Sequence, residues 1–152
     1  MRLDLTRIAA EIAAQWSQEN FLKCMREQSA PVKPFRGSET ILLVEDEAPI
    51  RKITALLLKR LGYRVQEASS GEEALRLAQG SREKIDLLMT DVDMPGMSGR
   101  ELAEVLRARD AGLKVLFLSG HTSVLHTEVT FLQKPFTLDA LSKKLREVLD
   151  RR

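Results

Sequence analysis

Short apolar runs alternate with amphipathic segments along most of this chain, and that alternation limits the possible folds more than any other feature. Mostly apolar runs short enough to be strands lie at 41–44, 85–90, 113–118 and 131–133, and residues 63–68 alternate in polarity. Strands separated by helices in this way predict a parallel sheet covered on both faces. We therefore expect an α/β fold, a doubly wound five-stranded parallel sheet.

The segments between these strands carry apolar residues at helical spacing together with helix-start signals. In two of them a serine is followed three residues later by a glutamate, which is the spacing of a capping box. In another, Pro49 lies in the first turn and Gly62 follows the last. We expect helices that begin at Ala48, Ser70, Ser98 and Thr137.

Residues 1–38 differ from the rest of the chain. Their first part has an apolar stripe at helical spacing, and residues 28–38 contain two prolines, a glycine and two serines, which is typical of a linker. We predict an N-terminal helix and linker over 1–38 and a separate domain over 39–152. A short helix with an apolar stripe is marginal in water, so we expect it to pack on something, and we favour a homodimer. The stripe consists of Leu5, Ile8, Ile12 and Trp16.

Charge and composition argue against several functions. The chain has 24 Lys+Arg and 22 Asp+Glu, and the net charge of +2 lies within residues 1–38, so residues 39–152 are neutral. A neutral domain lacks the basic surface that binds nucleic acid or an anionic membrane. The single cysteine, Cys24, cannot form an internal disulfide, and no apolar stretch is long enough to span a bilayer. We therefore expect a cytoplasmic protein with no nucleic-acid or membrane partner.

Charged and hydroxyl side chains follow the predicted strands where those strands end. In chain order they are Glu45 and Asp46, Asp91, Ser119 and Lys134. The carboxyl ends of parallel strands share one edge of the sheet, where such folds bind ligands. Three carboxylates at one place need a compensating cation, and Mg²⁺ is the usual divalent ion beside phosphate. With a hydroxyl and an ammonium group nearby, the set indicates phosphoryl transfer, with Asp91 as the nucleophile.

Each of these residues also has an ordinary structural interpretation. Asp46 could cap the helix that begins at Ala48, Ser119 could belong to a simple turn, and Lys134 could be a solvated surface charge. What favours a functional site is that all of them fall at the same ends of one sheet.

Four stretches of sequence carry a resemblance to a known family: ILLVEDE (41–47), LLMTDVDMPGMSGRE (87–101), LFLSG (116–120) and FLQKPF (131–136). Through them, residues 39–150 resemble the receiver domain of bacterial two-component response regulators. They are most similar to the receivers attached to hybrid sensor histidine kinases. The resemblance implies the flavodoxin-like receiver fold. It also implies a sensor histidine kinase or a histidine phosphotransfer protein as the partner.

The resemblance assigns a metal site and a phosphoryl acceptor. Glu45 and Asp46 match the acidic pair that holds Mg²⁺. Asp91 matches the phospho-accepting aspartate, which also touches the metal. Asp93 matches the position whose backbone carbonyl completes the metal ligands.

The resemblance also assigns the residues that respond to the phosphoryl group. Ser119 matches the hydroxyl residue that turns toward the phosphate, and Lys134 matches the lysine that contacts it. Phe131 matches the switch aromatic. The bond between Lys134 and Pro135 matches one that is usually cis. The chain is then a signalling receiver that catalyses only its own phosphorylation and dephosphorylation.

One departure from the family pattern affects the predicted architecture. Residues 120–130 provide only eleven positions between Ser119 and Phe131, fewer than family members usually have. A regular helix of three turns would use all of them. We therefore expect a shortened or irregular fourth helix.

Two other functions remain open from the sequence. Asp91 and Asp93 form a DxD pattern similar to that of haloacid-dehalogenase-type phosphatases, in which the first aspartate is the nucleophile. The domain could also be an interaction module that is never phosphorylated.

Overall fold

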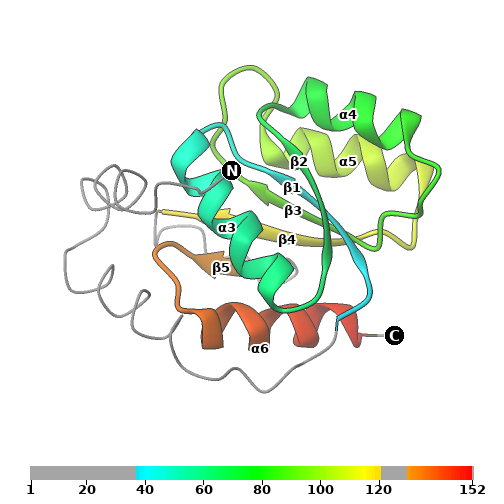
Figure 1. Ribbon diagram of the computed structural model, residues 1–152. Coiled ribbons are helices and arrows are strands. Elements are labelled where there is room, and N and C mark those ends of the chain that lie inside the picture. Colours follow the sequence, from blue (N-terminus) through cyan, green and yellow to red (C-terminus); the bar gives the residue numbers. More distant parts are fainter. Residues whose placement is uncertain (1–36, 121–129, 152) are drawn as a thin grey trace, which may run out of the picture.

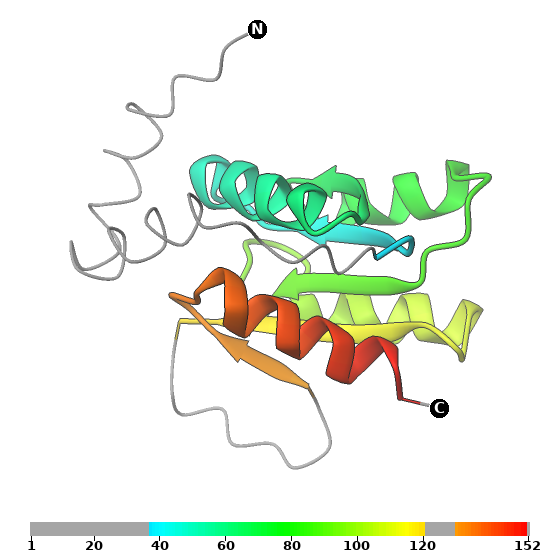
Figure 2. The same cartoon turned by 60° about the horizontal axis from the view of Figure 1, so that its bottom comes forward.

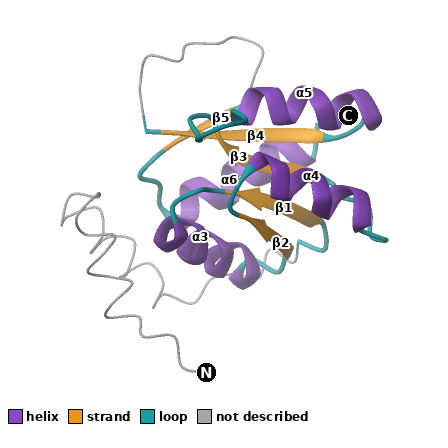
Figure 3. Cartoon of the chain, turned by 90° about the horizontal axis from the view of Figure 1, so that it is seen from above, coloured by secondary structure: helices purple, strands orange, loops and turns teal. Residues whose placement is uncertain are grey.

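The computed structural model describes residues 37–120 and 130–151 of the chain. Five strands form one parallel sheet in the order β2-β1-β3-β4-β5, with helices on both faces (Figure 1, Figure 3). The predicted doubly wound sheet is confirmed. The strands are β1 (Thr40–Val44), β2 (Arg64–Ala68), β3 (Leu87–Asp91), β4 (Lys114–Ser119) and β5 (Phe131–Gln133), and the described helices are α3 (Ala48–Arg60), α4 (Gly71–Gly80), α5 (Gly99–Arg109) and α6 (Leu138–Leu149).

The sheet separates two apolar layers, with α3 and α6 on one face and α4 and α5 on the other (Figure 1, Figure 2). Successive side chains of a strand point to opposite faces. In β1, Ile41 and Leu43 therefore pack with α3 and α6, whereas Leu42 and Val44 pack with α4 and α5. All four are fully buried. Burial on both faces explains why this strand is an unbroken apolar run in the sequence.

Hydroxyl residues cap three of the predicted helix starts, but only one of the two predicted capping boxes forms. At α4 the Glu73 carboxylate accepts hydrogen bonds from Ser69 and not from the Ser70 N–H. At α5 the Ser98 hydroxyl accepts a hydrogen bond from the Glu101 backbone N–H at 3.2 Å, and the Glu101 carboxylate accepts one from the Ser98 N–H at 2.8 Å. Ser70 and Thr137 cap α4 and α6 through their hydroxyl groups. Gly62 follows the end of α3 with φ of 96°, the left-handed conformation that glycine tolerates best.

Three predictions fall outside the described residues. The N-terminal helix and nearly all of its linker lie within residues 1–36, and the shortened fourth helix lies within residues 121–129. The division of the chain at residue 38 stays a prediction. Among the described residues, no helix is long and apolar enough to cross a membrane.

Candidate functional site

The parallel register of the sheet brings the predicted site residues to one edge. Glu45 and Asp91 lie at the carboxyl ends of the paired strands β1 and β3. Ser119 ends β4, and its backbone carbonyl accepts a hydrogen bond of 2.8 Å from the backbone N–H of Lys134. The peptide bond between Lys134 and Pro135 is cis, as expected. The neighbouring strands β1, β3, β4 and β5 therefore each contribute to one site.

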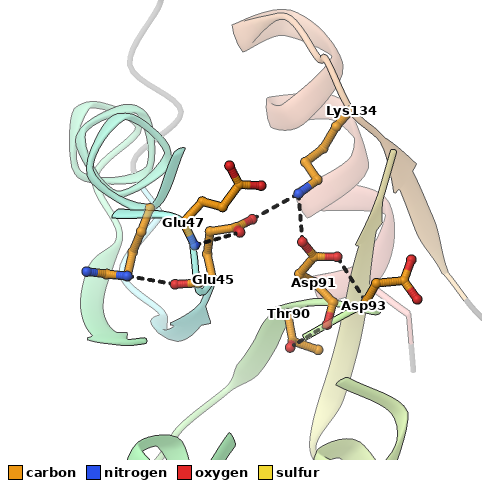
Figure 4. Close-up of polar contacts among 7 residues, drawn as sticks. Glu45, Glu47, Thr90, Asp91, Asp93 and Lys134 are labelled. Atoms are coloured by element: carbon orange, nitrogen blue, oxygen red, sulfur yellow. Dashed lines mark hydrogen bonds and ion pairs between the residues drawn. The ribbon is translucent and has the colours of Figure 1, made fainter. Parts of the chain in front are cut away.

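Lys134 reaches the two buried carboxylates at once (Figure 4). Its Nζ lies 2.7 Å from Asp91 Oδ2 and 3.0 Å from Glu45 Oε2. The side chains of Lys134, Glu45 and Asp91 are 11%, 0% and 9% exposed, respectively. The interpretation of Lys134 as a solvated surface charge is therefore wrong.

Burial controls the ionisation of this group. Burial is the main reason that the pKa of Glu45 is raised to about 7. The attraction of Lys134 works against this rise, and the nearby Asp91 charge adds to it. Burial alone would lower the pKa of Lys134, but hydrogen bonding to Asp91 and attraction to Glu45 outweigh it, and the net shift is upward. Lys134 therefore stays cationic between the two acids.

Three carboxylates form a cluster that can hold a cation. Glu45, Asp46 and Asp91 each offer an oxygen, and these oxygens lie within 4.8 Å of one another. A donor set made only of carboxylate oxygens suits a hard divalent ion such as Mg²⁺. The alternative that Asp46 caps α3 is wrong, because Glu47 is the N-cap residue and makes no side-chain capping bond.

Asp93 does not add its carboxylate to this cluster. Its side chain points away from Lys134, and its backbone N–H donates a hydrogen bond of 3.1 Å to Asp91 Oδ1 (Figure 4). This hydrogen bond helps to fix the orientation of the Asp91 carboxylate. The expected metal contact involves the Asp93 backbone carbonyl, and that role stays a prediction.

Ser119 and Phe131, the two predicted switch residues, lie on the adjacent strands β4 and β5. Ser119 is 3% exposed. Phe131, in β5, is half-buried and stacks on Phe117 of β4, with ring centroids 5.4 Å apart. Their responses to a phosphoryl group stay predictions.

Residues that the sequence analysis did not single out hold the backbone of the two key acids. Arg51 Nη1 donates a hydrogen bond of 2.7 Å to the backbone carbonyl of Glu45. Gly99 packs directly on Asp91, because a Cβ at position 99 would overlap the Asp91 carbonyl oxygen. The Pro/Gly turn after Asp91 contains Gly99, so the sequence held a signal for this close contact. Nothing in the sequence distinguishes Arg51 from other helix-surface arginines.

Comparison with known proteins relates this site to one family. The family model described as the response regulator receiver domain matches residues 41–146. The sensor kinase CckA of Brucella abortus (strain 2308) is 36% identical over 122 residues, which are 76% of this chain and 13% of that protein. The transcriptional regulatory protein GlrR of Escherichia coli (strain K12) is 33% identical over 117 residues, which are 72% of this chain and 26% of that protein. The chain thus spans a small part of these relatives.

Solved structures of receiver domains and response regulators are also similar to this chain. The receiver domain from the hybrid histidine kinase CckA is 42% identical, with a TM-score of 0.64 over 72% of this chain and 98% of that one. The response regulator protein TrrA from Thermotoga maritima, solved in complex with Mg²⁺ and BeF, is 32% identical, with a TM-score of 0.64 over 72% of this chain and 97% of that one.

Proposed function

Because the chain belongs to the response regulator receiver domain family, whose members are signalling modules rather than catalytic enzymes, we propose that Asp91 accepts a phosphoryl group in a two-component phosphorelay. The observation that carries the proposal is the contact of one ammonium group, that of Lys134, with both Asp91 and Glu45 at the edge of the sheet. Family membership argues against the phosphatase alternative. So does the Asp93 carboxylate, which faces away from Lys134 (Figure 4).

We further propose that the cation is Mg²⁺, held by the Glu45, Asp46 and Asp91 carboxylates and by the Asp93 backbone carbonyl. The cluster of three carboxylates supports this, as does the TrrA structure with Mg²⁺ and BeF. When bound, Mg²⁺ neutralises charge on the phosphoryl oxygens. Changing Glu45→Gln together with Asp46→Asn should greatly weaken Mg²⁺ binding in a calorimetric titration. An unchanged titration would rule out these ligands.

The phosphoryl donor in this proposal is the phosphohistidine of a sensor histidine kinase or a histidine phosphotransfer protein. An Asp91 carboxylate oxygen attacks the phosphorus, and the new O–P bond forms as the P–N bond breaks. The imidazole leaves with the electron pair of that bond. The Lys134 ammonium group balances charge on the phosphoryl oxygens, and the Ser119 hydroxyl donates a hydrogen bond to one of them. Phe131 then changes position, and a protein partner reads the change.

Incubation with acetyl phosphate and Mg²⁺ tests the proposal by intact mass. We expect the chain to gain one phosphoryl mass, and we expect EDTA or Asp91→Asn to abolish the gain. Asp139→Asn is the matched control, because it changes an exposed carboxylate of α6 outside the site and should leave labelling in place. A chain that never gains mass would instead be a non-phosphorylated interaction module. Steady hydrolysis of small phosphate esters would revive the phosphatase alternative.

A further inference from the structure

Arg100, in the first turn of α5, lies over two aromatic rings from neighbouring strands. Its guanidinium carbon is 5.7 Å from the ring centroid of Phe131 in β5 and 6.0 Å from that of Phe117 in β4. The two rings stack with an interplanar angle of 28°. A guanidinium group at these distances is attracted to the faces of both rings. One cation therefore holds together side chains of β4, β5 and α5.

The two rings belong to the strands that deliver the cationic and hydroxyl groups of the site. Phe117 pairs with Phe131 in the sheet register. Ser119 follows Phe117 by two residues, and Lys134 follows Phe131 by three. A change in the placement of Ser119 or Lys134 therefore acts on the strand segments that carry these rings.

The helix that carries Arg100 packs against the backbone of the acceptor aspartate. Gly99, the residue before Arg100, is buried, and its N–H donates a hydrogen bond of 3.1 Å to the Val92 carbonyl. No space for a Cβ exists between Gly99 and the Asp91 carbonyl oxygen. Close packing of this kind transmits displacement, because neither side can move without the other. Arg100 thus contacts the rings from a helix whose first residue rests on Asp91.

We propose that Arg100 is a positioning residue that couples the state of Asp91 to the stacked rings of Phe117 and Phe131. The proposal rests on the proposed function, since it requires that Asp91 be loaded. Before loading, Arg100 holds the Phe131 ring against Phe117. A phosphoryl group on Asp91 repositions Lys134 and Ser119 relative to the first turn of α5. Arg100 connects the first turn of α5 to the aromatic rings of β4 and β5. Its contact with Phe131 therefore changes when these elements shift, and the ring moves with it.

Fluorine NMR of the full chain with 4-fluorophenylalanine at position 131 tests this coupling. Mg²⁺ with beryllofluoride serves as the phosphoryl analogue, and the bound beryllofluoride signal in the same spectrum reports whether the site is loaded. In the otherwise unchanged chain, loading should shift the resonance of residue 131. In Arg100→Gln we expect that resonance to differ already before loading. The shift on loading should then fall about twofold or more.

Two further variants separate coupling from a general effect of the substitution. Arg100→Lys keeps a cation above the rings and should retain most of the loading-induced shift. Arg107→Gln removes an exposed arginine of the same helix and should behave like the unsubstituted chain. If loading shifts the residue 131 resonance equally in Arg100→Gln and in the unsubstituted chain, the coupling is wrong while the proposed function stands. If the unsubstituted chain shows no bound beryllofluoride, the proposed function fails, and the coupling fails with it.

Discussion

At the scale of single residues, the site depends on the balance between two buried carboxyl groups and the ammonium group of Lys134. Lys134 compensates Glu45 and Asp91 in a place where water screens charge poorly. Removing one partner of such a group leaves a buried charge uncompensated. The resulting loss of folding free energy is larger than the stabilisation that the intact contact provides.

We therefore expect Lys134→Met to lower the free energy of unfolding by about 3 kcal/mol at neutral pH without added metal. Added Mg²⁺ should restore part of this loss by compensating the same carboxylates. Lys144→Met is the matched control, because Lys144 pairs with Glu147 on the surface of α6. The free energy of unfolding of Lys144→Met should fall by no more than about 1 kcal/mol, and added Mg²⁺ should not change it. Equal losses in urea unfolding of the two variants would contradict this account of the site.

The sequence predicted the acids, the hydroxyl and the lysine of the site because the ends of parallel strands coincide in space. It did not predict Arg51 or Arg100, since their contacts depend on side-chain directions across two elements rather than on local spacing. The ordinary interpretation of Lys134 as a surface charge failed because burial is a property of the assembled sheet.

At the scale of elements, the first turn of α5 fixes the backbone of Asp91. Gly99→Ala places a methyl group against the Asp91 carbonyl oxygen, so either that backbone or the helix must shift. We expect a loss of stability of about 1–3 kcal/mol, together with slower labelling by acetyl phosphate. The measurements are urea unfolding and intact mass over time.

A glycine with free space around it supplies the control for this variant. A Cβ at Gly80, the last residue of α4, would meet nothing within 4 Å. Gly80→Ala should therefore leave labelling unchanged and stability equal or slightly higher. If the two alanine variants label at the same rate, the close approach of Gly99 to Asp91 has no role in the chemistry.

A second pair of elements is joined by an ion pair at the opposite end of β1. Glu39, directly before β1, accepts a hydrogen bond of 2.7 Å from Arg146 of α6. Burial works to raise the pKa of Glu39. The hydrogen bond from Arg146, hydrogen bonds from the backbone N–H groups of Glu39 and Ser38, and the attraction of Arg146 together outweigh burial and hold the pKa below its ordinary value of 4.5. A lowered pKa means that the pair stabilises the chain above pH 4.5 and that the contribution is lost as the pH falls below it.

Acid unfolding monitored by circular dichroism measures this contribution. Glu39→Gln should make stability depend less steeply on pH below 4.5. Glu83→Gln removes an exposed contact with Arg64 and serves as the control that should keep the original pH dependence. If the stability of Glu39→Gln depends on acidic pH as steeply as that of the unsubstituted chain, the contact with Arg146 contributes nothing to stability.

At the scale of the whole molecule, the alternation of apolar runs and amphipathic segments was sufficient to predict a five-stranded doubly wound sheet. Element ends were harder to predict. Residues Ile85 and Asp86 precede β3, although the apolar run begins at 85. A backbone hydrogen-bond ladder ends where pairing ends, and composition alone does not locate that point.

The N-terminal segment carries the remaining prediction about the whole chain. Gly37 is buried against the Tyr63 ring and donates a hydrogen bond to the Leu61 carbonyl, so a truncated chain should begin at residue 37. We expect the full chain to sediment as a dimer and the 37–152 chain as a monomer, because the apolar stripe at 5–16 needs a surface to cover it. Monomers in both samples, with equal thermal stability, would rule out a structural role for the stripe.

The most direct test of the central claim is to locate the phosphoryl group chemically. An acyl phosphate on an aspartate is reduced by borohydride to homoserine, so peptide mapping after reduction identifies the acceptor. After treatment with acetyl phosphate and Mg²⁺, we predict homoserine at position 91 and unmodified Asp46 and Asp93. Homoserine at either of those positions, or a chain that gains a phosphoryl mass but shows no homoserine at 91, would contradict the assignment of Asp91 as the acceptor.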